Sequence, residues 1–530
     1  MRTLFVVGSL VVLALLAVGT WFQPVVSLGF VLVAPVIIRG VQDMVQTKQA
    51  VRRNFPIIGN FRYLFELIRP EINQYFVESN TDGTPFNRDL RSLAYQRAKK
   101  EPDTVPFGTK LDVYEVGYEW VNHSLAPVHV EPDALRITVG GPQCSKPYSA
   151  SIFNVSAMSY GSLSKNAILA LNGGAQLGGF AHDTGEGGLS PYHLEPGGDI
   201  VWQIGTGYFS ARTLDGQFDP ERFKEHAARP QVKMLELKLS QGAKPGHGGI
   251  LPAAKVTPEI AKIRGVPQGR DVLSPPAHRA FSTPIGLLEF LQNMRELSGG
   301  KPVGFKLCLG KRREFLAICK AMKTTGIVPD FITVDGGEGG TGAAPLEFSN
   351  SVGAPLRESL IFVHNALTGF AVRKQVKVFC SGKVVTGFDV ISKLAIGADA
   401  CNSARAMMLA LGCIQALRCN TNECPTGVAT QNPSLVLGLD VNHKKVRVAN
   451  YHRETVKSVA EMVGAMGLKH TSELRPWHVM KRTGLADVQH YGALFEFIEE
   501  GSLLGATVPE AFKRPLDAAS PESFASGARG

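Results

Sequence analysis

From about residue 150, short apolar runs alternate with segments whose apolar residues have helical spacing. The apolar runs lie at 152–156, 178–182, 200–204, 234–239, 302–307, 331–335, 376–381 and 400–403. The helical segments lie at 163–176, 286–298, 312–325, 355–372, 388–397 and 405–418. Strands that alternate with helices pair in parallel, and eight such units can close on themselves. We therefore predict an α/β fold, a (β/α)8 TIM barrel. A doubly wound open sheet is the alternative, but no GxGxxG opens a first helix to support it.

Polar and glycine-rich residues gather where the predicted strands end. They are Ser159–Gly161, Thr184–Gly188, Lys238 with Gln241, Lys306 and Asp335–Gly337. In a barrel these ends form one face, where the loops between strands and helices carry the chemistry. Glycine-rich loops let backbone N–H groups approach a flat ring or a phosphate. We therefore expect the active site at this face.

Three of the eight cysteines, Cys413, Cys419 and Cys424, fall in one short stretch followed by Pro425. The other five are scattered, which is poor spacing for a disulfide framework and indicates a reducing compartment. Structural zinc normally has four protein ligands, and the nearest downstream candidate for a fourth is His443. A cuboidal cluster of three irons needs one thiolate per iron, and proline often follows the last cysteine of a cluster loop. The spacing therefore favours a cluster, with three buried apolar cysteines as the alternative.

The stretch from Leu4 to Ile38 contains no charged residue. One membrane span needs about 20 apolar residues, so the stretch suits two short spans better than one. We predict a helical hairpin at 4–21 and 24–38, with a single tilted span as a further reading. Basic residues before and after the stretch place both flanks on the cytoplasmic side of the cell membrane. A cleaved signal peptide is the alternative, but no clear small-x-small cleavage site adjoins the run.

The formal net charge of +10 raises the question of nucleic-acid binding. No tract rich in Lys and Arg is interleaved with aromatic residues, and no nucleic-acid motif occurs. Much of the positive excess lies near the N-terminus, where a membrane explains it better. We expect no nucleic-acid partner.

Four segments follow from these patterns: a membrane anchor at 1–40, a linker and helical layer at 41–149, the barrel at 150–475, and C-terminal helices with a polar tail at 476–530. Within the second segment, helical spacing predicts helices at 61–78 and 88–100. The chain is therefore predicted to combine a transmembrane hairpin, a barrel and a helical C-terminal tail.

Long motifs lie within the barrel segment: SAMSYGSLSKNA (156–167), DTGEGG (183–188), QGAKPGHGGILPAAKVTPEIAKIRG (241–265), SPPAH (274–278), DGGEGGTGAAP (335–345) and CNTNECPTGVATQNP (419–433). With these motifs the chain resembles the FMN-binding synthase domain of glutamate synthase from about residue 150 to 475. The resemblance implies FMN at the barrel mouth and a [3Fe–4S] cluster on Cys413, Cys419 and Cys424. It also implies reduction of 2-iminoglutarate, formed from 2-oxoglutarate and ammonia, to glutamate.

The resemblance also assigns roles to individual residues. Lys306 matches the lysine beside the flavin N1–C2 carbonyl, where a cation stabilises the reduced ring. Gln241 and Lys244 are candidates for holding the dicarboxylate substrate. The remaining predicted cofactor-binding residues are Ala157, Met158, Ser159, Ser381, Gly382, Asn402, Ser403 and Ala404. At the phosphate end this chain departs from the family's Asp-Gly-Gly-type turn and Gly-rich loop, since Ser381-Gly382-Lys383 and Asn402-Ser403-Ala404-Arg405 stand there. Their backbone N–H groups and polar side chains can still bind a phosphate.

Neither a glutaminase segment nor a Gly-repeat β-helix is evident in these residues. We therefore expect free ammonia, ammonia from a partner, or another amine, and an electron donor such as ferredoxin or a reductase subunit. The second hypothesis is a membrane-bound flavin and iron–sulfur protein that acts on another imine, an amine or a quinone. The third is a degenerate barrel that serves as a scaffold.

Overall fold

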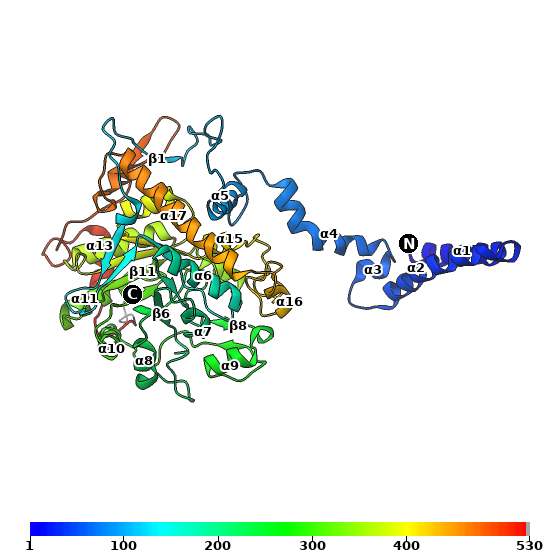
Figure 1. The fold of residues 1–530 in the computed structure, drawn as a ribbon, viewed down its shortest axis with the longest axis horizontal. Helices are drawn as coiled ribbons and strands as arrows, with labels where there is room; N and C mark the ends of the chain where they lie inside the picture. The colour runs from blue at the N-terminus through cyan, green and yellow to red at the C-terminus, as the bar shows by residue number, and fades with distance from the viewer. Residues whose placement is uncertain (526–530) are drawn as a thin grey trace. The chain divides into compact units, whose positions relative to one another are not determined.

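The computed structural model describes residues 1–525, and its main body is a closed barrel of parallel strands (Figure 1). In barrel order the strands are β4 (Phe153–Val155), β5 (His182–Asp183), β6 (Ile200–Ile204), β7 (Val232–Lys238), β10 (Val303–Leu307), β11 (Phe331–Asp335), β12 (Lys377–Ser381) and β13 (Ala400–Ser403). The pairing of β13 with β4 closes the barrel. The predicted barrel is confirmed, and each predicted apolar run overlaps one of these strands.

Helices follow the strands and cover the barrel. The main ones are α6 (Lys165–Gly178), α8 (Pro220–Ala227), α10 (Pro284–Leu297), α11 (Arg312–Thr325), α13 (Leu356–Gly369), α14 (Gly387–Ala395), α15 (Arg405–Leu411) and α17 (Val441–Ala465). Side-chain caps set several starts, as at α6, where the hydroxyl of Ser164 accepts the N–H of Ala167. The long helix α17 packs on α6. A Cβ at Gly174 would lie 2.6 Å from Val448, so glycine permits this close approach.

Two predicted element boundaries are wrong. The strand predicted at 178–182 begins only at His182, because α6 continues to Gly178 and Gly179 ends it in the left-handed conformation (φ 65°). The helix predicted at 405–418 ends at Leu411, because Gly412 adopts a φ of 112°. The rest of that segment is a loop.

The predicted helical C-terminal tail is also wrong in part. Two strands occur there, β14 (Val479–Arg482) and β15 (Val488–His490), and they form an antiparallel sheet with β1 (Glu119–Val121). The helices of this segment, α18 (Tyr491–Leu494) and α19 (Glu510–Asp517), are short. The strands pair with a partner far away in the sequence, which local periodicity cannot reveal. The last part of the predicted polar tail, residues 526–530, lies outside the described residues.

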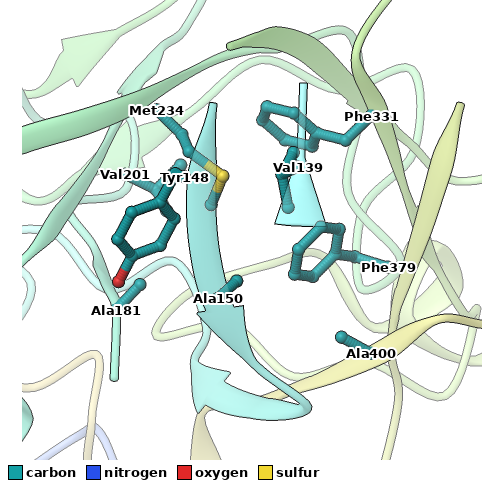
Figure 2. Packing of buried hydrophobic residues seen from close by; sticks show 9 residues of the cluster. All are labelled: Val139, Tyr148, Ala150, Ala181, Val201, Met234, Phe331, Phe379 and Ala400. Atoms are coloured by element: carbon teal, nitrogen blue, oxygen red, sulfur yellow. The ribbon is translucent and has the colours of Figure 1, made fainter. Parts of the chain in front are cut away.

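A hairpin of β2 (Arg136–Val139) and β3 (Tyr148–Ser151) packs its apolar side chains into the barrel (Figure 2). Val139, Tyr148 and Ala150 meet the apolar layer, which we define as Ala181, Val201, Met234, Phe331, Phe379 and Ala400. These residues lie at or near the start of their strands, so the hairpin closes the N-terminal end of the barrel. The C-terminal end is left for the site.

Two residues further along each strand, the barrel interior becomes polar. We define the polar layer as Asp183, Gln203, Glu236, Lys306, Thr333, Ser381 and Asn402, all of which are buried. Because strand side chains alternate with a period of two, these residues face the same interior as the apolar layer. The polar layer therefore lies toward the end of the barrel where active sites form.

Residues 1–88 form a separate unit, and the second unit, which contains the barrel, begins at Asp89. The helices of the first unit are α1 (Arg2–Phe22), α2 (Leu28–Val45), α3 (Ala50–Asn54) and α4 (Gly59–Ile72), and α5 (Arg88–Lys99) follows them. By length and composition, α1 and α2 are able to cross a membrane. The buried carboxylate of Asp43 accepts the N–H of Ile57 at 3.0 Å, which joins the end of α2 to the turn before α4.

Candidate active site

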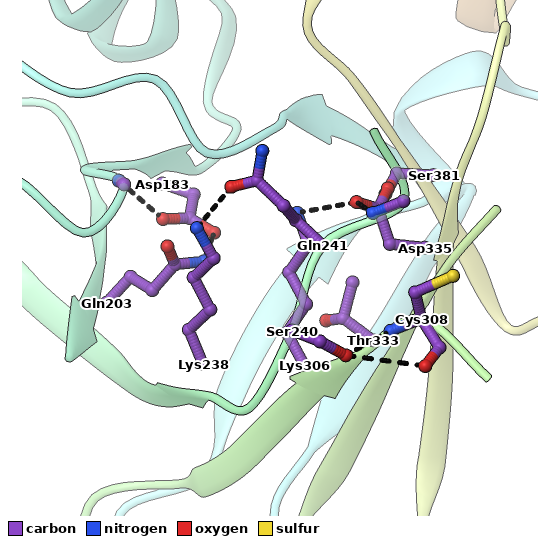
Figure 3. A network of polar contacts seen from close by, with 12 residues as sticks. Asp183, Gln203, Lys238, Ser240, Gln241, Lys306, Cys308, Thr333, Asp335 and Ser381 are labelled. Carbon is purple, nitrogen blue, oxygen red and sulfur yellow. Dashed lines mark hydrogen bonds and ion pairs between the residues drawn. The ribbon is translucent and has the colours of Figure 1, made fainter. Parts of the chain in front are cut away.

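Lys306 contributes the ammonium of the polar layer and is surrounded by carboxylates. Its Nζ lies 3.6 Å from Oδ2 of Asp335, and the same oxygen accepts the N–H of Gly242 at 2.8 Å (Figure 3). Burial lowers the pKa of Lys306, but Asp335, Glu236 and Asp183 outweigh it, so the pKa is raised overall. Lys306 is therefore a cation at neutral pH.

The carboxyl groups of Asp183 and Glu236 both lie close to the side-chain amide of Gln203. Nε2 of Gln203 donates to Oε2 of Glu236 at 2.6 Å and lies 3.4 Å from Oδ2 of Asp183. Glu236 also accepts the hydroxyl of Thr333, and Asp183 accepts the N–H of Gly185 at 2.9 Å. Burial, together with the charge of Glu236, raises the pKa of Asp183 well above its usual value. Asp183 therefore favours its protonated form.

Two buried acceptors of the polar layer have no hydrogen-bond partner within residues 1–525. They are Oε1 of Gln203 and Oδ1 of Asn402, which stand at the ends of β6 and β13. Buried polar atoms are nearly always hydrogen-bonded in native proteins. These two oxygens are suited to a ligand that brings N–H or O–H donors.

A group of cations surrounds Glu186 in the loop after β5. Nζ of Lys238 lies 2.9 Å from Oε1 of Glu186 and also donates to Oε1 of Gln241. Burial raises the pKa of Glu186. The positive charges of Lys238, Lys244 and Arg264 outweigh this effect, so the pKa is below its usual value overall. Three cations around one carboxylate leave a positive excess, which suits an anionic ligand.

Two of these cations, Lys244 and Arg264, donate hydrogen bonds to backbone carbonyls and not to a carboxylate. Burial lowers the pKa of Lys244 to about 8, and its Nζ donates to the carbonyl of Ala343 at 3.1 Å. Arg264, at the end of α9 (Pro258–Arg264), donates to the carbonyl of Tyr160 at 3.1 Å. Among the described residues, no acceptor bonds Nε of Arg264, although that atom is buried.

The loop residues predicted to contact the cofactor lie beside the DTGEGG loop. The N–H of Met158 donates to the carbonyl of Asp183 at 3.3 Å. Gly185 has a φ of 63°, and a Cβ there would lie 2.8 Å from the nitrogen of Ser159. Only glycine suits that position, and it brings the backbone of Ala157–Ser159 against the end of β5.

The predicted phosphate-binding residues lie on neighbouring strand ends, where Ser381 is opposite Asn402. The hydroxyl of Ser381 donates to Asp335, and the hydroxyl of Ser403 donates to the carbonyl of Val384 at 2.7 Å. Gly382 and Ala404 follow these two strands directly and have no polar side chain. The hydroxyls are thus used within the protein, so backbone N–H groups are the more available donors.

Cys413, Cys419 and Cys424 lie in the loop after α15, and all three are free thiols. Burial raises the pKa of Cys413 to about 12 and also raises that of Cys419, and the thiols influence one another. Burial acts in the same direction on Cys424, but hydrogen bonds from Thr426 and nearby amides lower its pKa overall. In the described part of the chain, no three His, Cys, Asp or Glu side chains are arranged to hold a metal ion. The cysteine loop is therefore no preformed site for a single ion.

The structure brings Lys306, Gln241 and Lys244 to the same end of the barrel, which is the end where the predicted strand ends place Lys306 and Gln241. Sequence reasoning missed Arg264, although it lies inside a quoted motif, and the acids Asp183 and Glu236. The signal for the acids was present, because each follows an apolar strand residue by two positions.

Comparison with known proteins agrees with these features. The conserved region of glutamate synthase matches residues 131–469. The glutamate synthase large subunit-like protein YerD of Bacillus subtilis is 38% identical over 83% of this chain and 91% of its own length. The archaeal glutamate synthase of Methanocaldococcus jannaschii is 35% identical over 61% of this chain and 60% of its own length.

A mutant flavocytochrome b2 with pyruvate bound aligns with 90% of this chain and 98% of its own, at 14% identity and a TM-score of 0.41. This likeness is too remote to carry an argument. The match over residues 131–469 and the likeness to YerD are enough to assign the family. The chain belongs to the glutamate synthase family, whose members are oxidoreductases acting on CH–NH2 donors.

Proposed function

We propose that the chain is an FMN- and iron–sulfur-dependent oxidoreductase that reduces 2-iminoglutarate, formed from 2-oxoglutarate and ammonia, to glutamate. The observation that carries the proposal is the pairing of a buried lysine in the polar layer with a cationic group at the same end of the barrel. A lysine there suits an electron-rich ring, and the cations suit a dicarboxylate. Membership of the glutamate synthase family supports this choice of chemistry.

FMN fits the residues at the barrel mouth. The two partnerless acceptors, Oε1 of Gln203 and Oδ1 of Asn402, match the N–H and hydroxyl donors of a flavin with its ribityl chain. Lys306 supplies the cation for the N1–C2 side of the ring. Backbone N–H groups of Ala157 and Ser159, and those near Gly382, Ser403 and Ala404, are the proposed contacts for the ring and the phosphate. When bound, FMN would accept electrons and deliver them to the imine as a hydride.

The substrate would be held by the cationic group around Glu186. Lys244 and Arg264 are the proposed partners of the two carboxylates, because both are buried cations without a carboxylate of their own at hydrogen-bond distance. Gln241 adds an amide and positions Lys238. An anion that enters this group gains charge-assisted hydrogen bonds and removes the positive excess.

The three cysteines fit a [3Fe–4S] cluster better than a single ion. A single ion draws its thiolates within about 4 Å of one another, since each Zn–S bond is about 2.3 Å. In a cluster each thiolate binds a different iron, so the sulfurs stand further apart. Three free thiols in one loop that affect one another's pKa support a metal group shared by all three.

We further infer that α1 and α2 form a hairpin in the cell membrane, with the barrel on the cytoplasmic side. Large apolar side chains are exposed along both helices, for example Leu15 (67%) and Leu32 (77%). Bulky apolar surface of this kind is costly in water but not in lipid. Electrons would come from a donor such as ferredoxin or a reductase subunit, and ammonia would be free or supplied by a partner.

Cofactor content tests the first half of the proposal. The full chain, purified anaerobically in detergent, should contain about one FMN and about three irons per polypeptide. Cys419→Ser should lose the iron but keep FMN, whereas Cys144→Ser, a free cysteine outside the loop, should keep both. Full iron in Cys419→Ser would contradict the ligand assignment, and a chain without FMN would favour the scaffold hypothesis.

A further inference from the structure

Lys255 is a buried lysine whose hydrogen bonds all end on backbone carbonyls. It closes the short 3₁₀ turn η4 (Ala253–Lys255) and is 2% exposed. Its Nζ donates to the carbonyl oxygens of Ser162 at 3.0 Å, Cys419 at 2.7 Å and Ala429 at 2.8 Å. An ammonium has three donors, so its hydrogen bonds are complete. Its charge, however, is not neutralised by these carbonyls.

Within residues 1–525, no carboxylate forms an ion pair with Lys255; its acceptors are neutral carbonyls. Its shortest hydrogen bond, at 2.7 Å, ends on the carbonyl of Cys419, one of the three proposed cluster ligands. A buried cation without an opposite charge is strongly unfavourable. The cysteines supply that opposite charge when they bind as thiolates. The structure thus places a cation that lacks a partner beside a group of ligands that becomes anionic on loading.

The same ammonium connects two loops. Ser162 lies in the loop that follows β4 and carries Ser159, whereas Cys419 lies in the cysteine loop. A second contact supports the connection, because Nδ2 of Asn422 donates to the carbonyl of Ala254 at 3.2 Å. Lys255 is therefore placed to hold the cysteine loop against the loop proposed to contact FMN.

We propose that Lys255 is the counter-ion of the iron–sulfur cluster, sets its reduction potential and positions its loop against the flavin-contacting loop. The inference rests on the proposed function, since it requires the cluster. Lys255 is a positioning residue, because it acts through the main chain of Cys419 and not as a ligand.

The effect on potential follows from charge. Each electron from a one-electron donor adds one negative charge to the cluster, the donor loses one electron, and no proton is required. A buried cation nearby stabilises the reduced cluster more than the oxidised one, and the low dielectric of the interior enhances the effect. Removal of the cation should lower the potential.

The first experiment is a potentiometric titration of the cluster, followed by electron paramagnetic resonance, in the full chain. Lys255→Met should keep about three irons but reduce the equilibrium constant for cluster reduction at least tenfold, which is about 59 mV for one electron. Lys255→Arg should restore most of the potential because it restores the charge. The matched control is Lys262→Met, an exposed lysine of the same segment, which should match the wild type. An iron-loaded Lys255→Met chain with unchanged potential would overturn the inference while leaving the proposed function intact.

A second measurement remains available if Lys255→Met does not retain iron. In a chain with all three cysteines changed to serine, Lys255 has no anionic partner, so Lys255→Met should raise the thermal midpoint there. A lysine that only closes three hydrogen bonds would lower the midpoint in this background when it is replaced, and that result would overturn the counter-ion role. A wild-type chain without iron would instead count against the proposed function.

Discussion

The Nζ of Lys306 lies 3.6 Å from Oδ2 of Asp335, inside a barrel layer that also holds the carboxyl groups of Asp183 and Glu236. Three acids thus surround one ammonium, and the charges of Asp335 and Glu236 keep it charged. This arrangement provides a fixed cation toward the end of the barrel where the other candidate residues gather. Electrostatic stabilisation of a reduced flavin needs such a preorganised charge.

Removal of that charge should lower the flavin potential. In Lys306→Met the reduced ring loses its cation, so the equilibrium constant for flavin reduction should fall at least tenfold, about 30 mV for two electrons. The buried acids also lose their partner, which should reduce the free energy of unfolding by about 3–5 kcal/mol. Spectroscopic redox titration and chemical unfolding measure the two effects. Asp335→Asn is the opposite control. It leaves the charge of Lys306 less neutralised, so the flavin potential should rise. Equal flavin potentials in the wild type and both variants would remove Lys306 from the flavin site.

Asp183 should make the protein less stable as pH rises. Its pKa is raised in the folded state, mainly by burial and then by Glu236, so the folded chain holds a proton that the unfolded chain releases above about pH 4. Stability from this group is therefore complete at low pH and is lost as pH rises toward the folded pKa. Asp183→Asn should raise the thermal midpoint relative to wild type, and more at pH 8 than at pH 5. The exposed Asp133→Asn should show no such trend; a gain for Asp183→Asn that shrinks with pH would contradict the assignment.

Arg264 should contribute to substrate binding. Arg264→Lys keeps a cation but loses the planar fork that binds a carboxylate through two N–H groups. KM for 2-oxoglutarate should rise about tenfold to a hundredfold, or about 1.4–2.7 kcal/mol, while kcat changes less. Steady-state kinetics with a chemical reductant measure both constants. Arg270→Lys, an exposed arginine nearby in sequence, is the control, and a fall in kcat at unchanged KM would argue against a binding role.

The N-terminal hairpin should be an anchor that the chemistry does not need. A chain without residues 1–45, which removes all of α1 and α2, should move from the membrane pellet to the soluble fraction and keep its FMN. Carbonate washing of membranes, followed by flavin measurement, checks both points. A full-length chain released by carbonate, or one cleaved near residue 20, would favour the signal-peptide alternative.

Local periodicity predicts most of the barrel because each strand and helix is defined within its own segment. The helix predicted at 312–325 matches α11, Arg312–Thr325, and the strand predicted at 331–335 matches β11, Phe331–Asp335. The predicted boundaries are wrong where one glycine in the left-handed conformation ends a helix, as at Gly179 and Gly412. The predictions also fail for β14, whose partner β1 is remote in the sequence.

Part of the candidate site was also predictable, because some of its residues can be placed from their own segment of the chain. Lys306 stands at the end of a predicted strand, and Gln241 and Lys244 stand in a long motif that follows another predicted strand, so their placement at one end of the barrel follows from the fold. The contact of Glu236 with Gln203 and the balance of charge around Lys306 depend on which strands become neighbours when the barrel closes. Lys255 was missed because its role depends on carbonyl groups from two other loops.

We expect this site to reduce the imine of 2-oxoglutarate. The most direct measurement reduces the flavin chemically under anaerobic conditions and then mixes the protein with 2-oxoglutarate and ammonium in a stopped-flow spectrophotometer. We expect rapid reoxidation with one glutamate formed per flavin, and no reoxidation when either compound is omitted. A flavin that stays reduced with both present would contradict the claim and point to another imine, an amine or a membrane quinone as the acceptor.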